Sequence, residues 1–112
     1  MSVIVREWRG RAAPGKAAAY PRHFRTNVLP ALRGVEGFLG ARLLRRRLSE
    51  AADGGTVEYT VLTRWSSLDA IKAFAGADIE QAVVEPEAVA ALVDYDRTVR
   101  HYEVLQETSV EG

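Results

Sequence analysis

Few side chains in this sequence could both accept and release a proton near neutral pH. The best candidates for a catalytic base are its two histidines, His101 and His23, because an imidazole titrates near neutral pH without special tuning. His101 falls in the last predicted strand, where a histidine satisfied within an interface explains it equally well. His23 precedes Phe24 on a predicted helix, where it either enters a cleft between helix and sheet or, as is commoner for helix-surface histidines, is solvated.

Aromatic and cationic side chains could surround a small apolar ligand. The candidate substrate-binding residues are Trp65, Trp8, Phe24, Tyr59, Arg6 and Tyr102. The arginine and the tyrosines could donate hydrogen bonds to a bound oxyanion, although an arginine in a strand could equally pair with a carboxylate such as Glu58 or Glu103. Each tryptophan is more often a core filler than a ligand platform, because it buries a large area. The two tryptophans belong to antiparallel strands that end at opposite edges of the sheet, so we expect that they do not touch.

Several classes of chemistry lack the residues that they need. The sequence has no cysteine, which excludes disulfides, thiolate catalysis and cysteine-ligated metals. The two histidines lack ligand-like spacing, so we predict no metal site. No glycine-rich loop follows a strand as in a phosphate cradle, and no Gly-x-Ser-x-Gly elbow is present. We therefore predict no cofactor.

Length and charge limit the cellular partners. The 112 residues predict a single domain spanning residues 1–112, and the 15 basic residues balance the 15 acidic ones. This balance argues against a nucleic-acid or acidic-membrane surface. The run Arg45-Arg46-Arg47 is the one basic cluster, and we interpret it as the solvated edge of a strand. No apolar run approaches the roughly 20 residues of a membrane span and no secretory signal is evident, so the expected location is the cytoplasm.

The spacing of apolar residues predicts four strands. The clearest runs from Val57 to Trp65, where β-branched and aromatic side chains alternate with period two. Directly after it, Ser66 could cap a helix, and Asp69 lies where a carboxylate favours the positive end of the helix dipole. The other strands are predicted at residues 2–11, 38–48 and 95–107.

Helical spacing fills the gaps between these strands. Residues 16–34 place Tyr20, Phe24, Val28 and Leu32 four apart on one stripe. Pro21 and Pro30 interrupt this region, so we expect a kinked helix or one that begins near Pro21, with Gly34 as its end. A second helix, carrying Leu68, Ile71 and Phe74, should end at Gly76. Residues 78–93 predict short helical turns broken at Pro86, and residues 51–55 predict a hairpin turn.

The order strand, helix, strand, strand, helix, strand predicts a ferredoxin-like α+β fold. Its four-stranded antiparallel sheet carries both helices on one face. All four strands have apolar residues on both sides, and the helices can cover only one of these sides. We therefore expect a homodimer, in which a second copy covers the open face sheet to sheet.

Three segments resemble the antibiotic biosynthesis monooxygenase family of dimeric α+β barrels. They are residues 5–10 (Val-Arg-Glu-Trp-Arg-Gly), residues 36–41 (Glu-Gly-Phe-Leu-Gly-Ala) and residues 59–70, and the likeness runs over nearly the whole chain. The strongest part is the apolar strand that ends in Trp65 with a helix directly behind it. Pro14-Gly15 before the first helix and Gly37-Phe38 before the second strand agree with the family.

The resemblance implies chemistry without metal or flavin in the oxygenase branch of the family. There, an electron-rich phenol or anthrone is deprotonated in a dry pocket, and its anion passes an electron to oxygen; Trp65 matches the tryptophan that lines the family pocket. Haem degradation is the weaker expectation. Trp8 stands where the haem-degrading members place an asparagine, and the segment after Trp65, including Val83 and Val84, lacks their histidine ligand.

Two classes of function remain open at this point. One is a cofactor-independent monooxygenase with His101 or His23 as the base, and the other is a non-catalytic dimer that binds a small apolar molecule or serves as a scaffold.

Overall fold

The computed structural model describes residues 2–48 and 55–110, so the predicted turn at residues 51–55 lies largely outside the described residues. The strands are β1 (Ile4–Ala12), β2 (Phe38–Arg47), β3 (Val57–Trp65), β4 (Asp94–Tyr95) and β5 (Arg100–Glu103). The helical segments are α1 (Ala19–His23), the π-helical η1 (Phe24–Val28), α2 (Leu29–Arg33), α3 (Leu68–Ala75) and α4 (Pro86–Ala91). Within the described residues, no helix is long and apolar enough to cross a membrane.

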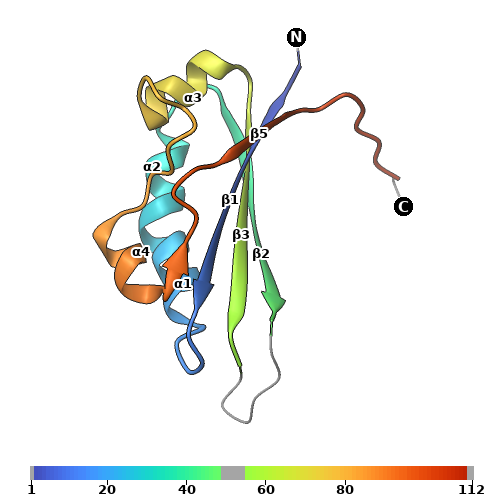
Figure 1. Ribbon diagram of the computed structural model, residues 1–112. Helices are drawn as coiled ribbons and strands as arrows, with labels where there is room; N and C mark the ends of the chain where they lie inside the picture. The colour runs from blue at the N-terminus through green and yellow to red at the C-terminus, as the bar shows by residue number, and fades with distance from the viewer. Residues whose placement is uncertain (1, 49–54, 111–112) are drawn as a thin grey trace.

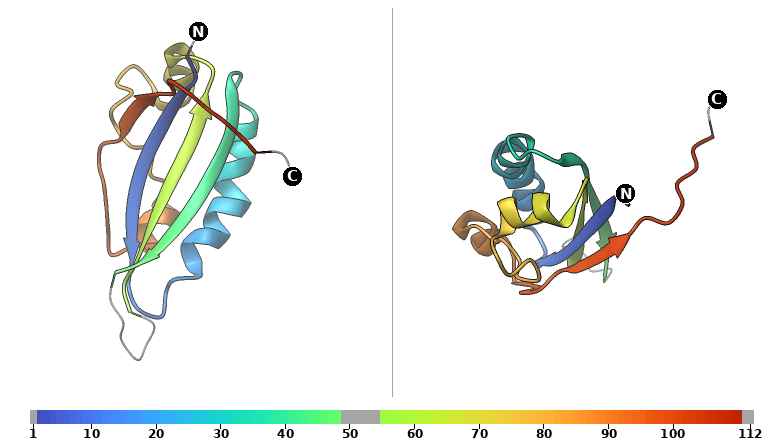
Figure 2. Two further views of the ribbon diagram at one scale, coloured as in Figure 1. Left: turned by 90° about the vertical axis from the view of Figure 1, so that its right-hand side faces the viewer. Right: turned by 90° about the horizontal axis from the view of Figure 1, so that it is seen from above.

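The strands form one antiparallel sheet with all helices on one side (Figure 1). Its order is β2-β3-β1-β4, and β5 also pairs with β1, so the first and third strands lie at the centre. The opposite face of the sheet is bare of helices (Figure 2). This arrangement is the ferredoxin-like α+β fold that the element order predicts.

Strict alternation on the two central strands decides which side chains enter the protein. In β1, every second residue from Ile4 to Ala12 is buried on the helix side, and the residues between them are half-exposed. In β3, alternate positions from Val57 to Trp65 are buried in the same layer. Because neighbouring side chains on a strand point to opposite faces, the sequence period fixes which residues share a face, and the packing of the helices decides which face is buried.

The first helical region is continuous and contains no sharp break at either proline. It starts at Ala19, three residues later than expected, and runs to Arg33. Pro30 has no backbone N–H to donate, and the preceding turn widens into η1, where the Leu29 N–H bonds to Phe24 O instead. The π-helical turn thus accommodates the proline for which we expected a kink, and Gly34 ends the helix as predicted.

The predicted last strand, residues 95–107, is wrong in its extent because the chain leaves β1 between β4 and β5. The Asp96 N–H still bonds to Arg9 O, but the Val99 N–H bonds to Glu80 O, and Thr98 forms a bridge with Gln81. The residues after β4 therefore turn toward the segment that precedes α4. This detour lets one short stretch contact both the sheet and the covering segment.

The bare face of the sheet is more polar than we expected from the apolar residues on both sides of each strand. Leu44, Leu62 and Tyr102 do lie there, but charged residues separate them along the strands. Glu58 accepts from Arg46 at 2.9 Å and from Arg11 at 3.3 Å, and the pKa of its carboxyl is lowered mainly by the hydrogen bond from Arg46. The face is therefore a lattice of ion pairs with apolar side chains between them.

Helix α3 is capped by a different serine from the expected Ser66. The Ser67 hydroxyl accepts from the Ala70 N–H at 3.1 Å, whereas the Ser66 N–H bonds to Gly37 O and ties the junction to the start of β2. Asp69 lies in the first turn as predicted, and Gly76 ends the helix with a φ of 90°. The sequence located the cap region correctly but selected the wrong one of two adjacent hydroxyls.

The cap gives a direct test of this correction. Replacing Ser67 with alanine should lower the free energy of unfolding by about 1 kcal/mol, because one N–H of the first turn loses its partner. Ser66→Ala is the matched control and should cost clearly less, since no cap depends on its hydroxyl. Urea unfolding followed by circular dichroism measures both, and an equal or larger loss for Ser66→Ala would contradict the assignment.

Candidate active site

A narrow cavity lies between the helices and the sheet, and we call it the Arg6 cavity. Its polar lining residues are Arg6, Tyr20, Thr63 and Glu85, and the rest of its wall is apolar, with Trp8 and Phe74 as further aromatic surfaces. The cavity volume is about 50 Å³, far below the roughly 300–1,000 Å³ of pockets that hold drug-sized ligands. A ligand with more than one ring therefore needs the wall to move.

Arg6 brings a positive charge into this apolar layer. The residue is 5% exposed, and burial lowers the pKa of its guanidinium to about 10, so it stays charged at neutral pH. Its donors bond to Ile79 O and to Gln81 O, the latter at 2.8 Å, and its Cζ lies 5.9 Å from the centre of the Phe74 ring. Among the described residues, no carboxylate lies within ion-pair distance of Arg6, so the alternative of a strand arginine paired with Glu58 holds for Arg11 and Arg46 but not for Arg6.

His101 lies opposite Arg6 on the neighbouring strand. The distance between Arg6 Nη1 and His101 Nε2 is 3.0 Å. A guanidinium can only donate, so Nε2 must accept and the imidazole must be neutral. Burial and the Arg6 charge lower the pKa of His101, with a smaller opposing effect from Glu80. The accepting nitrogen is thus used by Arg6, and His101 does not line the cavity.

His23 is buried, which corrects the solvated position that we favoured from sequence. Its Nε2 lies 3.2 Å from Glu85 Oε2, and its Nδ1 lies 2.9 Å from Asn27 Nδ2. An amide NH₂ can only donate, so Nδ1 accepts and the Nε2–H donates to the Glu85 carboxylate. Glu85 lines the cavity, while His23 and Asn27 line an open groove beside α4. The pair therefore separates the cavity from the groove.

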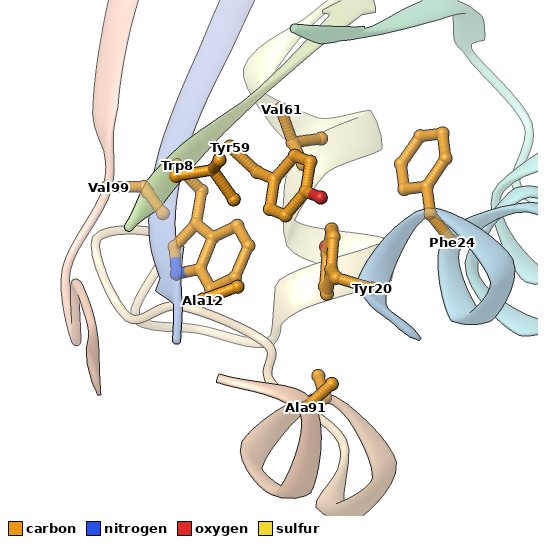
Figure 3. Close-up of a cluster of buried hydrophobic side chains, with 10 residues drawn as sticks. Trp8, Ala12, Tyr20, Phe24, Tyr59, Val61, Ala91 and Val99 are labelled. Carbon is orange, nitrogen blue, oxygen red and sulfur yellow. The ribbon is translucent and has the colours of Figure 1, made fainter. Parts of the chain in front are cut away.

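Trp8 and Tyr20 form one aromatic wall of the cavity (Figure 3). Their ring centres lie 5.6 Å apart, and the Trp8 Nε1–H donates to Asp96 O at 2.7 Å, which fixes the indole. Burial raises the pKa of the Tyr20 phenol, and the nearby Glu85 carboxylate raises it further. Tyr20 therefore keeps its proton and offers the cavity a donor.

The other predicted site residues lie away from the cavity lining. Trp65 is fully buried in a separate core cluster beneath α3, where its Nε1–H donates to Thr63 Oγ1 at 2.8 Å. Phe24 and Tyr59 are buried in the main core near Tyr20 (Figure 3). The Tyr59 hydroxyl donates to Ala17 O. Tyr102 is 47% exposed on the bare face of the sheet. The two tryptophans fall in different clusters, in agreement with our expectation that they do not touch.

Sequence reasoning identified Arg6 and Trp8 but missed Tyr20, Thr63, Phe74 and Glu85. The first three carried a usable signal, since each occupies a position that the strand or helix period turns inward. Glu85 carried none, because it lies in an irregular segment and reaches the cavity only through tertiary packing. Among the described residues, no cluster of three or more histidine, aspartate or glutamate side chains could hold a metal ion.

Solved structures of similar shape come from several bacteria. A protein from Bacillus cereus assigned to the antibiotic biosynthesis monooxygenases aligns with a TM-score of 0.67 and 17% identity, covering 98% of this chain and 100% of that one. A haem-degrading protein from Mycobacterium tuberculosis gives a TM-score of 0.60 and 20% identity, covering 96% and 99%. A Streptomyces coelicolor monooxygenase in complex with nanaomycin D gives 0.53 and 17%, covering 99% and 92%. At these identities the likeness concerns the fold alone.

The sequence comparisons are more specific about ancestry. No curated protein matches the chain. The family model described as antibiotic biosynthesis monooxygenase matches residues 1–86, which include β1 to α3 and most of the residues that line the Arg6 cavity. The chain therefore belongs to the antibiotic biosynthesis monooxygenase family.

Proposed function

We propose that this protein is a cofactor-independent monooxygenase that oxidises a small aromatic or polyphenolic substrate with O2 in the Arg6 cavity. The observation that carries the proposal is the buried Arg6 guanidinium, which no described carboxylate neutralises, in a wall of aromatic and aliphatic side chains. Leaving a buried charge without an opposite charge costs free energy, and such groups concentrate at functional sites. A phenolate or enolate is a ligand that supplies both the missing negative charge and an apolar ring.

The proposed reaction needs little from the protein beyond this environment. A base removes a proton from the substrate, and the resulting anion, held by Arg6, gives one electron to O2. The two radicals then join in a carbon–oxygen bond, and the peroxide anion takes back the proton that the base removed. Loss of water from this hydroperoxide leaves a carbonyl. One oxygen atom enters the product, and the other leaves as water with two hydrogens from the substrate. Arg6 stabilises the anion, while the apolar wall keeps water out.

The alternative is a non-catalytic dimer that binds a small apolar molecule or serves as a scaffold, and it uses the same cavity without the electron transfer. The crystal structure with nanaomycin D concerns a monooxygenase of the same fold and supports the catalytic version by analogy. Haem fits this chain poorly. The cavity volume is about 50 Å³, and none of the described residues that line it is a histidine.

We also propose that two copies pack sheet to sheet. Support comes from the apolar side chains Val5, Leu44, Leu62 and Tyr102 on the bare face, of which Leu44 is 46% exposed. The arginines between these side chains would face the partner, so the interface must also neutralise their charge. Within one copy, Glu58 does this for Arg46 and Glu7 does it for Arg100.

Substitution of Arg6 tests the proposed function. Arg6→Met should weaken binding of hydroxylated aromatic compounds roughly 10- to 150-fold, which corresponds to the loss of a charged hydrogen bond of about 1.5–3 kcal/mol. Oxygen uptake with any compound that the wild type oxidises should fall at least as much. Arg33→Met removes an exposed arginine from α2 and serves as the matched control. If no compound that binds to the wild type causes oxygen uptake, the oxygenase proposal fails and the binding alternative stands.

The lowered pKa of Arg6 sets an upper pH limit on anion binding. Burial shifts the pKa of the Arg6 guanidinium from 12.5 to about 10. The buried charge therefore destabilises the folded protein below pH 10, and this destabilisation is lost as the pH rises further. Affinity for a ligand that is ionised throughout should be constant below the Arg6 pKa and fall above it. A titration by tryptophan fluorescence measures this limit, and an unchanged limit in Arg6→Met would exclude Arg6 as its origin.

The dimer is tested by its mass in solution. Sedimentation equilibrium at micromolar concentration should give the mass of two chains for the wild type. Leu44→Asp places a carboxylate on the open face and should shift the protein toward one chain, because it buries an additional charge in the interface. The mass of a single chain for the wild type would refute the sheet-to-sheet dimer.

A further inference from the structure

The polar groups of the Arg6 cavity differ in their ability to accept a proton. Arg6 is only a donor, and the raised pKa of Tyr20 keeps its phenol protonated. The Thr63 hydroxyl already accepts from Trp65 and points to Arg6 O at 3.5 Å. Glu85 is the remaining polar group of the lining, and a carboxylate accepts protons readily.

The Glu85 carboxylate is held from outside the cavity. Its Oε2 receives the His23 Nε2–H at 3.2 Å, and the Asn27 amide holds the other ring nitrogen. Its Oε1 has no hydrogen-bond partner among the described residues. One oxygen is thus anchored by a buried imidazole in a fixed tautomer, and the other has no described partner. The Glu85 side chain is 37% exposed, so this second oxygen is not enclosed by the protein and a ligand can reach it.

We propose that Glu85 is the catalytic base of the Arg6 cavity, with His23 as a positioning residue whose tautomer is set by Asn27. The proton of a bound phenol moves to Glu85 Oε1 while Arg6 stabilises the phenolate that remains. His101 takes no part in this transfer, because its accepting nitrogen is bonded to Arg6. Other ionisable groups around this pair are Tyr20, whose ring centre lies 6.0 Å from that of His23, and Arg22 and Glu87 in the groove.

This inference rests on the proposed function only in requiring that a phenol enters the cavity. The probe is 4-nitrophenol, whose phenolate absorbs at longer wavelength than the neutral phenol. Calorimetry in two buffers of different ionisation enthalpy gives the number of protons released on binding. If Glu85 takes the proton, the wild type should form bound phenolate without releasing a proton to the buffer.

Four variants separate a base from a structural residue. Glu85→Gln should bind the neutral phenol or release one proton for each phenolate formed, whereas Glu87→Gln, the same substitution in α4 outside the cavity lining, should behave like the wild type. His23→Phe removes the anchor at similar size, and with any oxidised compound it should lower kcat roughly 10- to 100-fold with little change in KM. His23→Gln can still donate to Glu85 and should restore most of that loss.

Each outcome decides between the two proposals. Stoichiometric proton release by the wild type, or wild-type behaviour of Glu85→Gln, overturns the assignment of Glu85 while leaving the proposed function intact. Retained protons without oxygen uptake by any compound support Glu85 and overturn the oxygenase. Failure of the nitrophenol to bind the wild type overturns both.

Discussion

The arrangement of the layer between the helices and the sheet depends on the buried Arg6 guanidinium. The charge lies on the helix side of β1, where alternation would otherwise place an apolar residue between Ile4 and Trp8. It is solvated by two backbone carbonyls and by a neutral histidine, so its hydrogen bonds are satisfied while its charge is not neutralised. The layer between helices and sheet therefore holds a guanidinium charge that no described carboxylate neutralises at ion-pair distance, in a low-dielectric setting where a charge acts strongly on a ligand.

The same interaction ties the covering segment to the sheet. Ile79 and Gln81, whose carbonyls bind Arg6, precede the residues Val83 to Glu85 that close the cavity. Arg6 therefore joins the sheet to the segment that closes the cavity. Since the cavity volume is only about 50 Å³, the proposed function requires this segment to move when a ring enters.

The two tryptophans have different roles because the strand register places them in different parts of the interior. Trp8 pairs with Val61 and lines the cavity together with Tyr20, whereas Trp65 pairs with Ile4 and fills the space beneath α3. Trp65 still acts on the cavity indirectly, since its Nε1–H fixes the Thr63 hydroxyl. Trp65, which the family resemblance assigned to the pocket, is thus separated from the cavity by Thr63 in this chain. Trp8 supplies the aromatic surface.

The sequence by itself determined the order of the elements and the fold, because these follow from local periodicity: period two from Val57 to Trp65, the four-residue stripe from Tyr20 to Leu32, and the glycines that end helices. The family came from the resemblance of three segments, residues 5–10, 36–41 and 59–70. The sequence also named Arg6 and Trp8 as candidate binding residues, but it left open which face of β1 is turned inward, because both faces carry apolar residues. It could not decide between Ser66 and Ser67 as the cap, since both hydroxyls are adjacent and only backbone geometry distinguishes them. Only the tertiary structure brought Glu85 to the cavity and buried His23 behind it, because the two residues are 62 positions apart. A contact at that separation depends on how α1 and α4 pack, and no local pattern in the chain encodes it.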